Sequence, residues 1–315
     1  MCGIVGFFDK AGGPAPVGAT VLAMLSALGC RGPDSAGIAF WGDEVDGVVV
    51  RVKPGDGAGV EARRREIVRR ARRLGRVRSS VDHGSLLRLE IAKADPGQLA
   101  LAIEAVAPDV EVVSMGRRLE IVKQVGAPRS LEVDFGVSKV RASHGLGHTR
   151  LSTESRVDLS HSQPFWAHGC PDLAVVHNGH ITNYHRLRRL YEQDGVRFYT
   201  ENDSEVIGVY LAGKLRAGAT LGEALRDSVR ELDGSFSYLA ATGDAFGFAK
   251  DPFCLKPLIV AETDGAVAIA NEEIALAAAL PSGYSAREAG AGAVRVWARA
   301  PGAPRRRARR AAGIA

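Results

Sequence analysis

The sequence predicts an α+β protein built of layered strands and helices, rather than a chain of repeating βαβ units. Three observations predict this class. Strand-like runs lie at both ends of the chain, helical stretches lie between and after them, and no internal repeat is visible. With 315 residues the chain is long enough for one large domain or two ordinary ones, with a substantial core.

The composition is that of a globular protein from a reducing compartment. It is 46% hydrophobic and 24% charged, and no apolar run is long enough to span a bilayer. The N-terminus lacks the basic segment and apolar stretch of a secretory signal, so we expect a cytoplasmic protein with no membrane association. The four cysteines are widely spaced, with no CxxC pair, and are expected to be reduced thiols that bind no metal.

The N-terminal part is predicted to alternate between strand and helix. Residues 2–8 form a short buried strand, and residues 9–16 a loop. Apolar residues at helical spacing predict a helix over 17–30. Residues 31–37, RGPDSAG, form a Gly/Pro turn whose glycines let the backbone approach another group closely, and residues 38–41 form the next strand.

The sequence changes character over residues 45–140, and we interpret this stretch as an elaboration inserted into the core. It contains a basic helix over 61–74, a second helix over 96–106 and two strands over 110–114 and 118–123. Seven arginines lie on the basic helix: Arg63, Arg64, Arg65, Arg69, Arg70, Arg72 and Arg73.

The arginines of this helix permit three interpretations. They can bind nucleic acid or another anionic partner, form a solvated face, or dock an acidic subunit. The helix lacks the aromatic stacking residues or named motif of nucleic-acid binders. We therefore favour the solvated or docking face and expect no nucleic-acid partner.

The core is predicted to resume at residue 142. A strand over 173–176 ends at His177-Asn178-Gly179, and a helix follows over 187–194. The next helix covers 206–215, with Asp203 or Ser204 as its N-cap.

An amphipathic helix over 221–232 precedes the C-terminal strands. These strands cover 234–241, 246–250, 258–262 and 266–270. Hairpin turns are expected at Asp233-Gly234, Gly243-Asp244 and Asp264-Gly265.

Asn271 is expected to cap a closing helix that runs to Leu280, and residues 293–298 form the last strand. One domain is therefore predicted over 2–300. An Arg-rich tail over 301–315 is expected to be disordered.

Cys2 is a candidate nucleophile. It follows Met1, whose removal is favoured by the small second side chain and leaves the cysteine N-terminal. The residue then carries a thiol together with an α-amine whose reference pKa is roughly 7.7–8.0. A thiol beside a partly neutral amine is an activated nucleophile. A small hydrophobic residue that opens a buried strand explains the same cysteine equally well, and position alone does not separate the two interpretations.

Four further residues complete the requirements for cleaving a primary amide. Asn178 and Gly179 offer a side-chain NH₂ and an unobstructed backbone N–H, and such oxyanion donors contribute roughly 3–4 kcal/mol each. Arg150 can bind a carboxylate through two parallel hydrogen bonds, and Asp203 can pair with an ammonium group. Taken singly, an arginine after a strand is usually a surface residue and an aspartate before a helix is usually a cap.

Separated motifs carry a family resemblance when taken together in chain order. They are MCGIVGFF, RGPDSAG, GHTRLST, VHNGHITN, ENDSE, ELDGSFSYLA and KDPFCLKPL. The sequence resembles the class II (N-terminal nucleophile) glutamine amidotransferases over nearly the whole chain outside about 45–140 and the tail. The resemblance implies the four-layer αββα sandwich of N-terminal nucleophile hydrolases.

The resemblance also implies roles for individual residues. Cys2 would attack the side-chain amide of glutamine, and Asn178 and Gly179 would form the oxyanion hole. Arg150 and Asp203 would hold the α-carboxylate and α-amine of the substrate.

Four further positions take implied places around this site. Thr153 and His177 would lie at the pocket edge, and Arg31 and Gly32 on the loop beside the nucleophile. Lys250 departs from the family pattern, because many relatives carry arginine there.

The resemblance further implies a context in which released ammonia passes to an acceptor site elsewhere. The chain ends about where the glutaminase ends, so no acceptor domain is expected. The closing motifs look most like the stand-alone glutaminase subunit of glutamate-synthase-like complexes, namely the first subunit of N-methylglutamate synthase (methylamine–glutamate N-methyltransferase). The region 45–140 would then dock the partner subunits.

This context makes L-glutamine and glutamate-synthase-like subunits the expected partners. No cofactor is expected in this chain, because it lacks the cysteine spacings that would hold an iron–sulfur centre, and any flavin or iron–sulfur centre would lie on partner subunits. Two alternatives remain: a self-sufficient amide hydrolase, and a non-catalytic glutamine sensor or nucleic-acid-binding relative.

Overall fold

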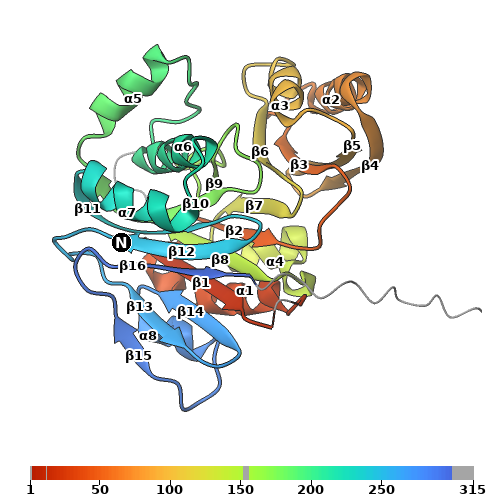
Figure 1. The fold of residues 1–315 in the computed structure, drawn as a ribbon. Coiled ribbons are helices and arrows are strands. Elements are labelled where there is room, and N and C mark those ends of the chain that lie inside the picture. Colours follow the sequence, from red (N-terminus) through yellow and green to blue (C-terminus); the bar gives the residue numbers. More distant parts are fainter. Residues whose placement is uncertain (1, 12, 152–155, 300–315) are drawn as a thin grey trace, which may run out of the picture.

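The predicted α+β class is confirmed. The computed structural model describes residues 2–11, 13–151 and 156–299. Its strands form a seven-stranded, a five-stranded and a four-stranded sheet (Figure 1). The predicted tail over 301–315 lies outside the described residues.

The seven-stranded sheet has the N-terminal strand near its centre. Every adjacent pair in it is antiparallel. Its order is β15 (Ala286–Glu288), β13 (Ile259–Glu262), β14 (Ala266–Ala270), β1 (Gly3–Asp9), β8 (His144–Arg150), β2 (Ser35–Trp41) and β7 (Leu119–Val125).

Helix α1 (Val17–Ala27) packs on β1, β8 and β2. Its predicted apolar spacing is confirmed, since Val17, Val21, Met24 and Leu25 are fully buried. The helix is shorter than the predicted 17–30, because the chain turns into a 3₁₀ segment at Gly29–Arg31.

The five-stranded sheet is also antiparallel. Its order is β16 (Val294–Ala298), β12 (Ala245–Lys250), β11 (Gly234–Ala241), β10 (Ala174–Ile181) and β9 (Phe165–Trp166). The helices on this side are α5 (Tyr184–Gln193), α6 (Asp203–Arg216) and α7 (Leu221–Glu231); α6 contacts β10, α7 contacts β12 and β16, and α5 contacts α6.

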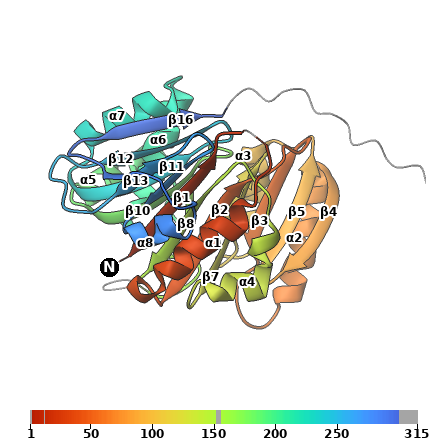
Figure 2. The same cartoon turned by 90° about the horizontal axis from the view of Figure 1, so that it is seen from below.

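The two larger sheets contact each other through their central strands. β1 and β8 both contact β10 and β11. The contact is close because Gly6 on β1 has no side chain: a Cβ there would lie 2.7 Å from the ring of Phe246 on β12. Figure 2 shows α1 lying across β1, β8 and β2, with α6 and α7 on the side of the five-stranded sheet. Strand β1, which Cys2 precedes, therefore lies at the interface between the two sheets.

The inserted region forms the four-stranded sheet, which lies to one side of the other two (Figure 2). Its strands are β4 (Arg76–His83), β5 (Leu86–Ala92), β3 (Val48–Lys53) and β6 (Glu111–Gly116), and its helices are α2 (Val60–Leu74) and α3 (Pro96–Glu104). Strands β3, β4 and β5 are absent from the sequence-based assignment. Charged residues interrupt β3, and β4 is largely exposed, so neither has a clear apolar pattern.

Strand β7, near the end of the 45–140 stretch, belongs to the seven-stranded sheet and not to the separate one. It pairs with β2 along its whole length, from Ser35 opposite Val125 to Trp41 opposite Leu119. Helix α4 (Arg129–Phe135) follows and packs on β7 and α1. The separate sheet therefore ends with β6.

Three sequence-based predictions of caps and turns are wrong. The N-cap of α6 is Asn202, whose Oδ1 accepts from the N–H of Ser204 at 3.0 Å, so Asp203 and Ser204 are not the cap. Asp233-Gly234 joins α7 to β11 and is not a hairpin turn. The Gly243-Asp244 and Asp264-Gly265 hairpins are confirmed.

The third wrong prediction concerns Asn271, which does not cap a helix. The last helix, α8 (Glu273–Ala277), follows Glu272 and is shorter than predicted. Asn271 instead accepts a hydrogen bond from the N–H of Ile4 and donates one to the Pro257 carbonyl at 3.0 Å. It thus fixes the start of β1.

Within the described residues, no helix has both the length and the apolar character needed to cross a bilayer.

Candidate active site

Cys2 lies immediately before β1, at the end of the seven-stranded sheet. Its Sγ lies 3.8 Å from the Leu151 carbonyl, at the end of the neighbouring β8. The next residue, Gly3, pairs with Thr149, and a Cβ on Gly3 would lie 2.7 Å from the Thr149 Oγ1. The half-buried thiol is therefore held beside the carboxyl end of β8.

Arg150 is the last residue of β8 and is buried despite its charge. Its Nη1 donates to the Arg156 carbonyl at 2.8 Å. Burial lowers the pKa of Arg150, while the nearby Cys2, Asp158 and Asp34 oppose that change. Because an arginine side chain stays protonated in proteins, the site holds a fixed cation close to the thiol.

Arg31 and Gly32 lie against the same strand ends. Arg31 donates from Nε to the Cys2 carbonyl at 3.3 Å and forms an ion pair with Glu272. Gly32 packs on β8 so closely that a Cβ would lie 2.6 Å from the backbone N of Arg150. Only glycine fits at position 32, which explains the sequence of the turn.

Asn178 and Gly179 lie on β10, in the facing sheet. Asn178 is buried, and its Nδ2 has no hydrogen-bond partner among the described residues. Gly179 has φ of +140°, and a Cβ there would lie 2.1 Å from the Ser235 carbonyl oxygen on β11. An orphaned buried donor is rare in proteins, so this side chain is available to a ligand.

One edge of β10 carries a row of backbone donors. The N–H of His177 donates to Gln163 Oε1 at 2.6 Å, and the N–H of Ile181 donates to Asp203 Oδ2 at 2.8 Å. N–H groups alternate in direction along a strand, so that of Gly179 points to the same edge as these two. The edge therefore faces Gln163 and Asp203, away from β11.

His177 and Asp203 are neighbours across this edge. His177 Nδ1 lies 2.9 Å from Ser204 Oγ and 3.6 Å from Asp203 Oδ1. Burial lowers the pKa of His177, and the Asp203 carboxylate partly opposes this. The lowered pKa favours the neutral ring, so His177 is not a charged partner of Asp203, whose Oδ1 also lies 3.5 Å from Ser204 Oγ.

His148 links the two halves of the site. It is fully buried on β8, and Arg150 and His177 both lie close enough to lower its pKa; burial is the largest cause and brings it to about 3. Cys2, Arg31, Gly32 and Arg150 thus meet at the ends of β1 and β8, with His177, Asn178, Gly179 and Asp203 on the facing β10 and α6. Thr153 lies outside the described residues.

Sequence reasoning missed three polar residues of this site: His148, Gln163 and Ser204. His148 and Ser204 stand inside motifs that were recognised, GHTRLST and ENDSE, so their presence was visible but their contacts were not. Gln163 makes its bonds to residues more than ten positions away, and no local pattern signals them.

Lys250, the departure from the family pattern, lies at the end of β12 and is fully buried. Its Nζ donates to the Ala289 carbonyl at 2.9 Å and to Glu288 Oε1 at 3.2 Å. These bonds tie β12 to the strand β15 of the other sheet, so the lysine has a structural role.

Comparisons with known proteins agree with this geometry. A glutamine amidotransferase domain model matches residues 148–278. A putative glutamine amidotransferase of Methanothermobacter thermautotrophicus is 38% identical over 88% of this chain and 93% of its own length. The glutamine amidotransferase-like protein GlxB of Rhizobium meliloti is 37% identical over 91% of this chain and 94% of its own.

The fold is also similar to solved structures. A Bacillus subtilis glutamine phosphoribosylpyrophosphate amidotransferase matches with a TM-score of 0.59 and 20% identity, over 96% of this chain. This chain covers 50% of that longer one. With a thiol and a fixed cation at the ends of β1 and β8, an orphaned donor on the facing strand β10, and two relatives matched over nearly their full length, the chain belongs to the class II glutamine amidotransferases, which hydrolyse the side-chain amide of glutamine.

Proposed function

We propose that this protein hydrolyses L-glutamine to glutamate and ammonia through a γ-glutamyl thioester on Cys2. The observation that carries the mechanism is the buried Nδ2 of Asn178, which has no partner among the described residues. Leaving such a group unpaired costs about 1–3 kcal/mol. That cost is recovered when an oxyanion forms beside it.

The proposed first step joins the Cys2 Sγ to the amide carbon of glutamine. The thiol proton moves to the α-amine of Cys2, and the carbonyl oxygen becomes an oxyanion. The Asn178 Nδ2 and the Gly179 N–H donate to that oxyanion. The amine then returns the proton to the leaving nitrogen, ammonia departs, and water hydrolyses the thioester.

The substrate is proposed to be held at its α-carbon. The guanidinium of Arg150 binds the α-carboxylate with two parallel bonds, and the Asp203 carboxylate binds the α-ammonium. His177 shapes the pocket edge next to Asp203, and Thr153 takes the same role by family resemblance. Arg31 and Gly32 hold the loop against the nucleophile.

We also assign the arrangement of layers to the αββα sandwich of the N-terminal nucleophile hydrolases. Contacts of α1 with the seven-stranded sheet, of α6 and α7 with the five-stranded sheet, and of the two sheets with each other support this assignment. The small separate sheet is then an addition to one side.

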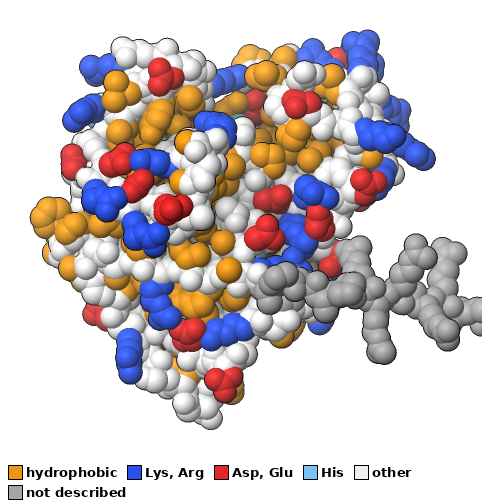
Figure 3. Space-filling model, viewed as in Figure 1, with side chains coloured by type: hydrophobic (Ala, Val, Ile, Leu, Met, Phe, Trp, Pro, Cys, Tyr) orange, Lys and Arg blue, Asp and Glu red, His pale blue; other side chains and the backbone are white. Residues whose placement is uncertain are grey.

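For the wider context we propose a glutaminase subunit of a cytoplasmic, glutamate-synthase-like complex of the N-methylglutamate synthase type. Its partner subunits would carry any flavin or iron–sulfur centre and would use the nitrogen released here. The names of the two relatives that match over nearly their full length specify no acceptor for the ammonia. The inserted region offers a docking surface: Lys and Arg side chains gather over α2 and β4 on the face drawn in Figure 3.

The α2 arginines are partly engaged within the chain. Arg64 pairs with Glu61 and Asp82, and Arg69 and Arg70 both pair with Glu66. These bonds favour a protein-docking or solvated face over a nucleic-acid surface, whose arginines would be directed at phosphates.

The mechanism is tested by intact mass measurement before and after treatment with a glutamine-analogue diazo-ketone. We expect loss of Met1 and one adduct on Cys2 that excess glutamine blocks. A retained methionine without an adduct would remove the N-terminal nucleophile mechanism.

The context is tested separately by the rate of ammonia release. A partnered glutaminase is slow alone and is stimulated by its complex, whereas a self-sufficient hydrolase is fully active alone. A non-catalytic nucleic-acid binder would show salt-sensitive nucleic-acid binding and no change on Cys2→Ala.

A further inference from the structure

The irregular segment Arg156–Gln163, here called the bridging segment, touches both ends of the candidate glutamine pocket. At one end, the Arg156 carbonyl accepts from Arg150 Nη1 at 2.8 Å. At the other, Gln163 Nε2 donates to the His177 carbonyl and to Ser204 Oγ, both at 3.1 Å. The segment therefore spans from the residue proposed to bind carboxylate to the neighbours of the residue proposed to bind ammonium.

The bridging segment is folded on itself by Asp158. Its Oδ1 accepts from the His161 backbone N at 2.8 Å and lies 2.7 Å from the His161 ring, and its carbonyl accepts from Ser162 Oγ at 2.6 Å. This compact turn transmits the position of Ser162 to the rest of the segment. A contact that holds Ser162 therefore restrains the turn that lies between the two ends of the segment.

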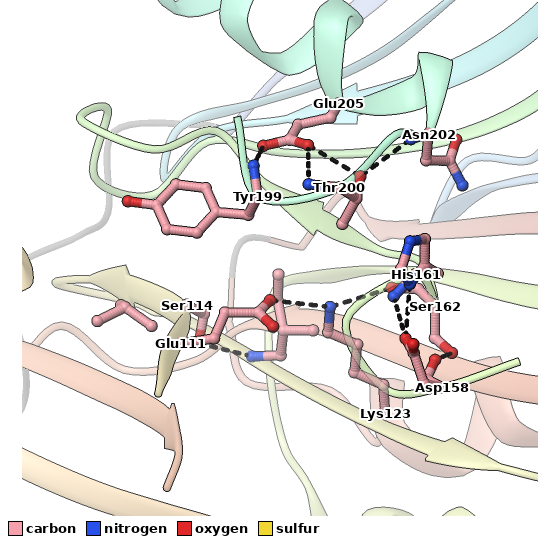
Figure 4. Close-up of polar contacts among 12 residues, drawn as sticks. Glu111, Ser114, Lys123, Asp158, His161, Ser162, Tyr199, Thr200, Asn202 and Glu205 are labelled. Atoms are coloured by element: carbon pink, nitrogen blue, oxygen red, sulfur yellow. Dashed lines mark hydrogen bonds and ion pairs between the residues drawn. The ribbon is translucent and has the colours of Figure 1, made fainter. Parts of the chain in front are cut away.

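Lys123 fixes Ser162 from outside the segment. It lies on β7, is 1% exposed, and donates from Nζ to the Ser162 carbonyl at 3.0 Å. Figure 4 shows its amine directed between Ser162 and Glu111, the latter 3.8 Å away on β6. Its ammonium also lies 5.3 Å from the centre of the Phe165 ring.

Burying this lysine is costly for stability. Removing an ammonium group from water costs several kcal/mol, and an apolar side chain of similar length often serves stability as well or better. Burial lowers the pKa of Lys123, while Glu111, Glu205 and Asp158 oppose that change. A stability role alone does not account for a charge at this position.

The inserted region also contacts the segment that precedes α6. Glu104 on α3 accepts from the Tyr199 hydroxyl at 2.6 Å, and Glu205 accepts from the Tyr199 and Thr200 backbone N–H groups at 2.8 and 2.9 Å. In Figure 4, Tyr199, Thr200 and Glu205 form a bonded group above Lys123 and Glu111. The bridging segment is thus held by Lys123 on β7 at Ser162 and by Ser204 at the start of α6 through Gln163.

We infer that Lys123 is a positioning residue of the glutamine pocket, which holds the bridging segment so that Arg150 and Asp203 stand at the separation that the α-carboxylate and α-ammonium require. This inference rests on the proposed function, since it concerns how that substrate is bound. If Lys123 acts in this way, the boundary between β7 and the four-stranded inserted sheet has a role in the affinity for glutamine.

The test compares variants that separate the hydrogen bond from the ion pair. Glu111→Gln removes the ion pair and keeps the bond to Ser162, so we expect KM for glutamine within twofold of wild type. Lys123→Met in the Glu111→Gln background removes the bond without leaving a carboxylate unpaired. We expect it to raise KM about tenfold, with a smaller change in kcat, because a misplaced contact weakens binding most.

Two further measurements exclude a merely structural effect. The double variant should unfold at a temperature no lower than Glu111→Gln, because an apolar replacement of a buried charge is tolerated. Lys123→Arg, which keeps a cationic donor, should restore most of the affinity. A KM that stays within twofold of wild type in the double variant would overturn the inference, as would a KM increase that only follows loss of stability.

A second variant approaches the segment from its other end and leaves the buried ion pair intact. Gln163→Met removes the bonds to His177 and Ser204, and it should raise KM by a similar factor; an unchanged KM would also overturn the inference. Parallel assays of the Cys2→Ala variant and of diazo-ketone labelling distinguish failure of the inference from failure of the proposed function. If the wild-type protein neither hydrolyses glutamine nor takes up the label, the proposed function is wrong. If the wild-type protein is active but neither variant changes KM, only the inference about Lys123 is wrong.

Discussion

Ile181 donates its backbone N–H to Asp203 Oδ2 at 2.8 Å, and this bond joins β10 to the first residue of α6. The cap of the helix is Asn202, so the Asp203 carboxylate is not consumed in satisfying the helix N-terminus. Its second oxygen, Oδ1, lies 3.6 Å from His177 Nδ1. The aspartate is therefore fixed by one oxygen, while Oδ1 has, among the described residues, only long contacts, to His177 and, at 3.5 Å, to Ser204 Oγ.

Replacing Cys2 with alanine should abolish glutamine hydrolysis and diazo-ketone labelling, because in the proposed mechanism the thioester forms on the Cys2 Sγ. We expect kcat to fall by at least about 10³-fold. The assay is ammonia release from glutamine. Cys170→Ala is the matched control: Cys170 contributes a backbone carbonyl to Trp166 Nε1, so loss of its thiol should leave activity intact. Equal activity of Cys2→Ala and wild type would contradict the mechanism.

Replacing Asn178 with aspartate keeps the shape of the side chain and removes its donor. We expect kcat to fall by about 10²–10³-fold with a smaller change in KM, because in the proposed mechanism the Nδ2 donates only to the oxyanion. Steady-state kinetics on the variant measure this. Should KM rise instead, with kcat preserved, Asn178 would be a ground-state binding residue.

Replacing Gly179 with alanine should destabilise the protein strongly, since the new Cβ would meet the Ser235 carbonyl at 2.1 Å in a backbone of φ +140°. Gly195→Ala is a matched control: φ there is +83°, but no atom lies within 4 Å of the added Cβ. The control should cost about 1 kcal/mol of unfolding free energy from backbone strain alone. If Gly179→Ala and Gly195→Ala lowered the thermal unfolding temperature equally, β10 would have to relax around the clash.

Replacing Asp203 with asparagine should weaken the recognition of the substrate ammonium. We expect KM for glutamine to rise about 10–100-fold, and the preference for glutamine over an analogue without the α-amine to disappear. Comparing kcat/KM for the two substrates isolates this contact from any general loss of activity. Retention of the preference would assign the ammonium to another group.

The buried histidines should make stability depend on pH. Burial lowers the pKa of His144 and of His148 to about 3, from an ordinary value of 6.5. Between those values the unfolded chain binds more protons, so stability is full above pH 6.5 and falls as the pH drops. Each ring contributes a slope of about 1.4 kcal/mol per pH unit. His148→Gln should therefore reduce the pH dependence of the unfolding free energy by the contribution of one histidine, as measured by urea unfolding at about pH 5 and 6. An unchanged slope would show that His148 is protonated in the folded protein.

Local sequence determined several features of this protein. The spacing of Val17, Val21, Met24 and Leu25 predicted the buried face of α1, because helix periodicity is a local property. Gly32 of the RGPDSAG motif and Gly179 of the VHNGHITN motif marked two of the places where a side chain would collide with a neighbouring strand. The motif order indicated the glutamine amidotransferase family, which the comparisons confirm.

The inserted region shows where local pattern failed. Strand β3 carries the buried Arg51, which pairs with Glu120, so a charged residue stands where apolar alternation would be expected. Strand β4 is an edge strand whose residues are mostly exposed. Both are strands because of their sheet partners, and those partners are not written in their own sequence.

The sequence by itself indicated the candidate chemistry, since a cysteine that follows Met1, an Asn-Gly pair, and an Arg and an Asp in family motifs occur together in the family's order, although each taken singly is ambiguous. The tertiary structure decided which groups act together. Asn202, and not Asp203, caps α6, and Lys123 reaches the Ser162 carbonyl from 39 residues away. Such choices depend on which polar groups become buried together, and burial is fixed only when distant strands pack.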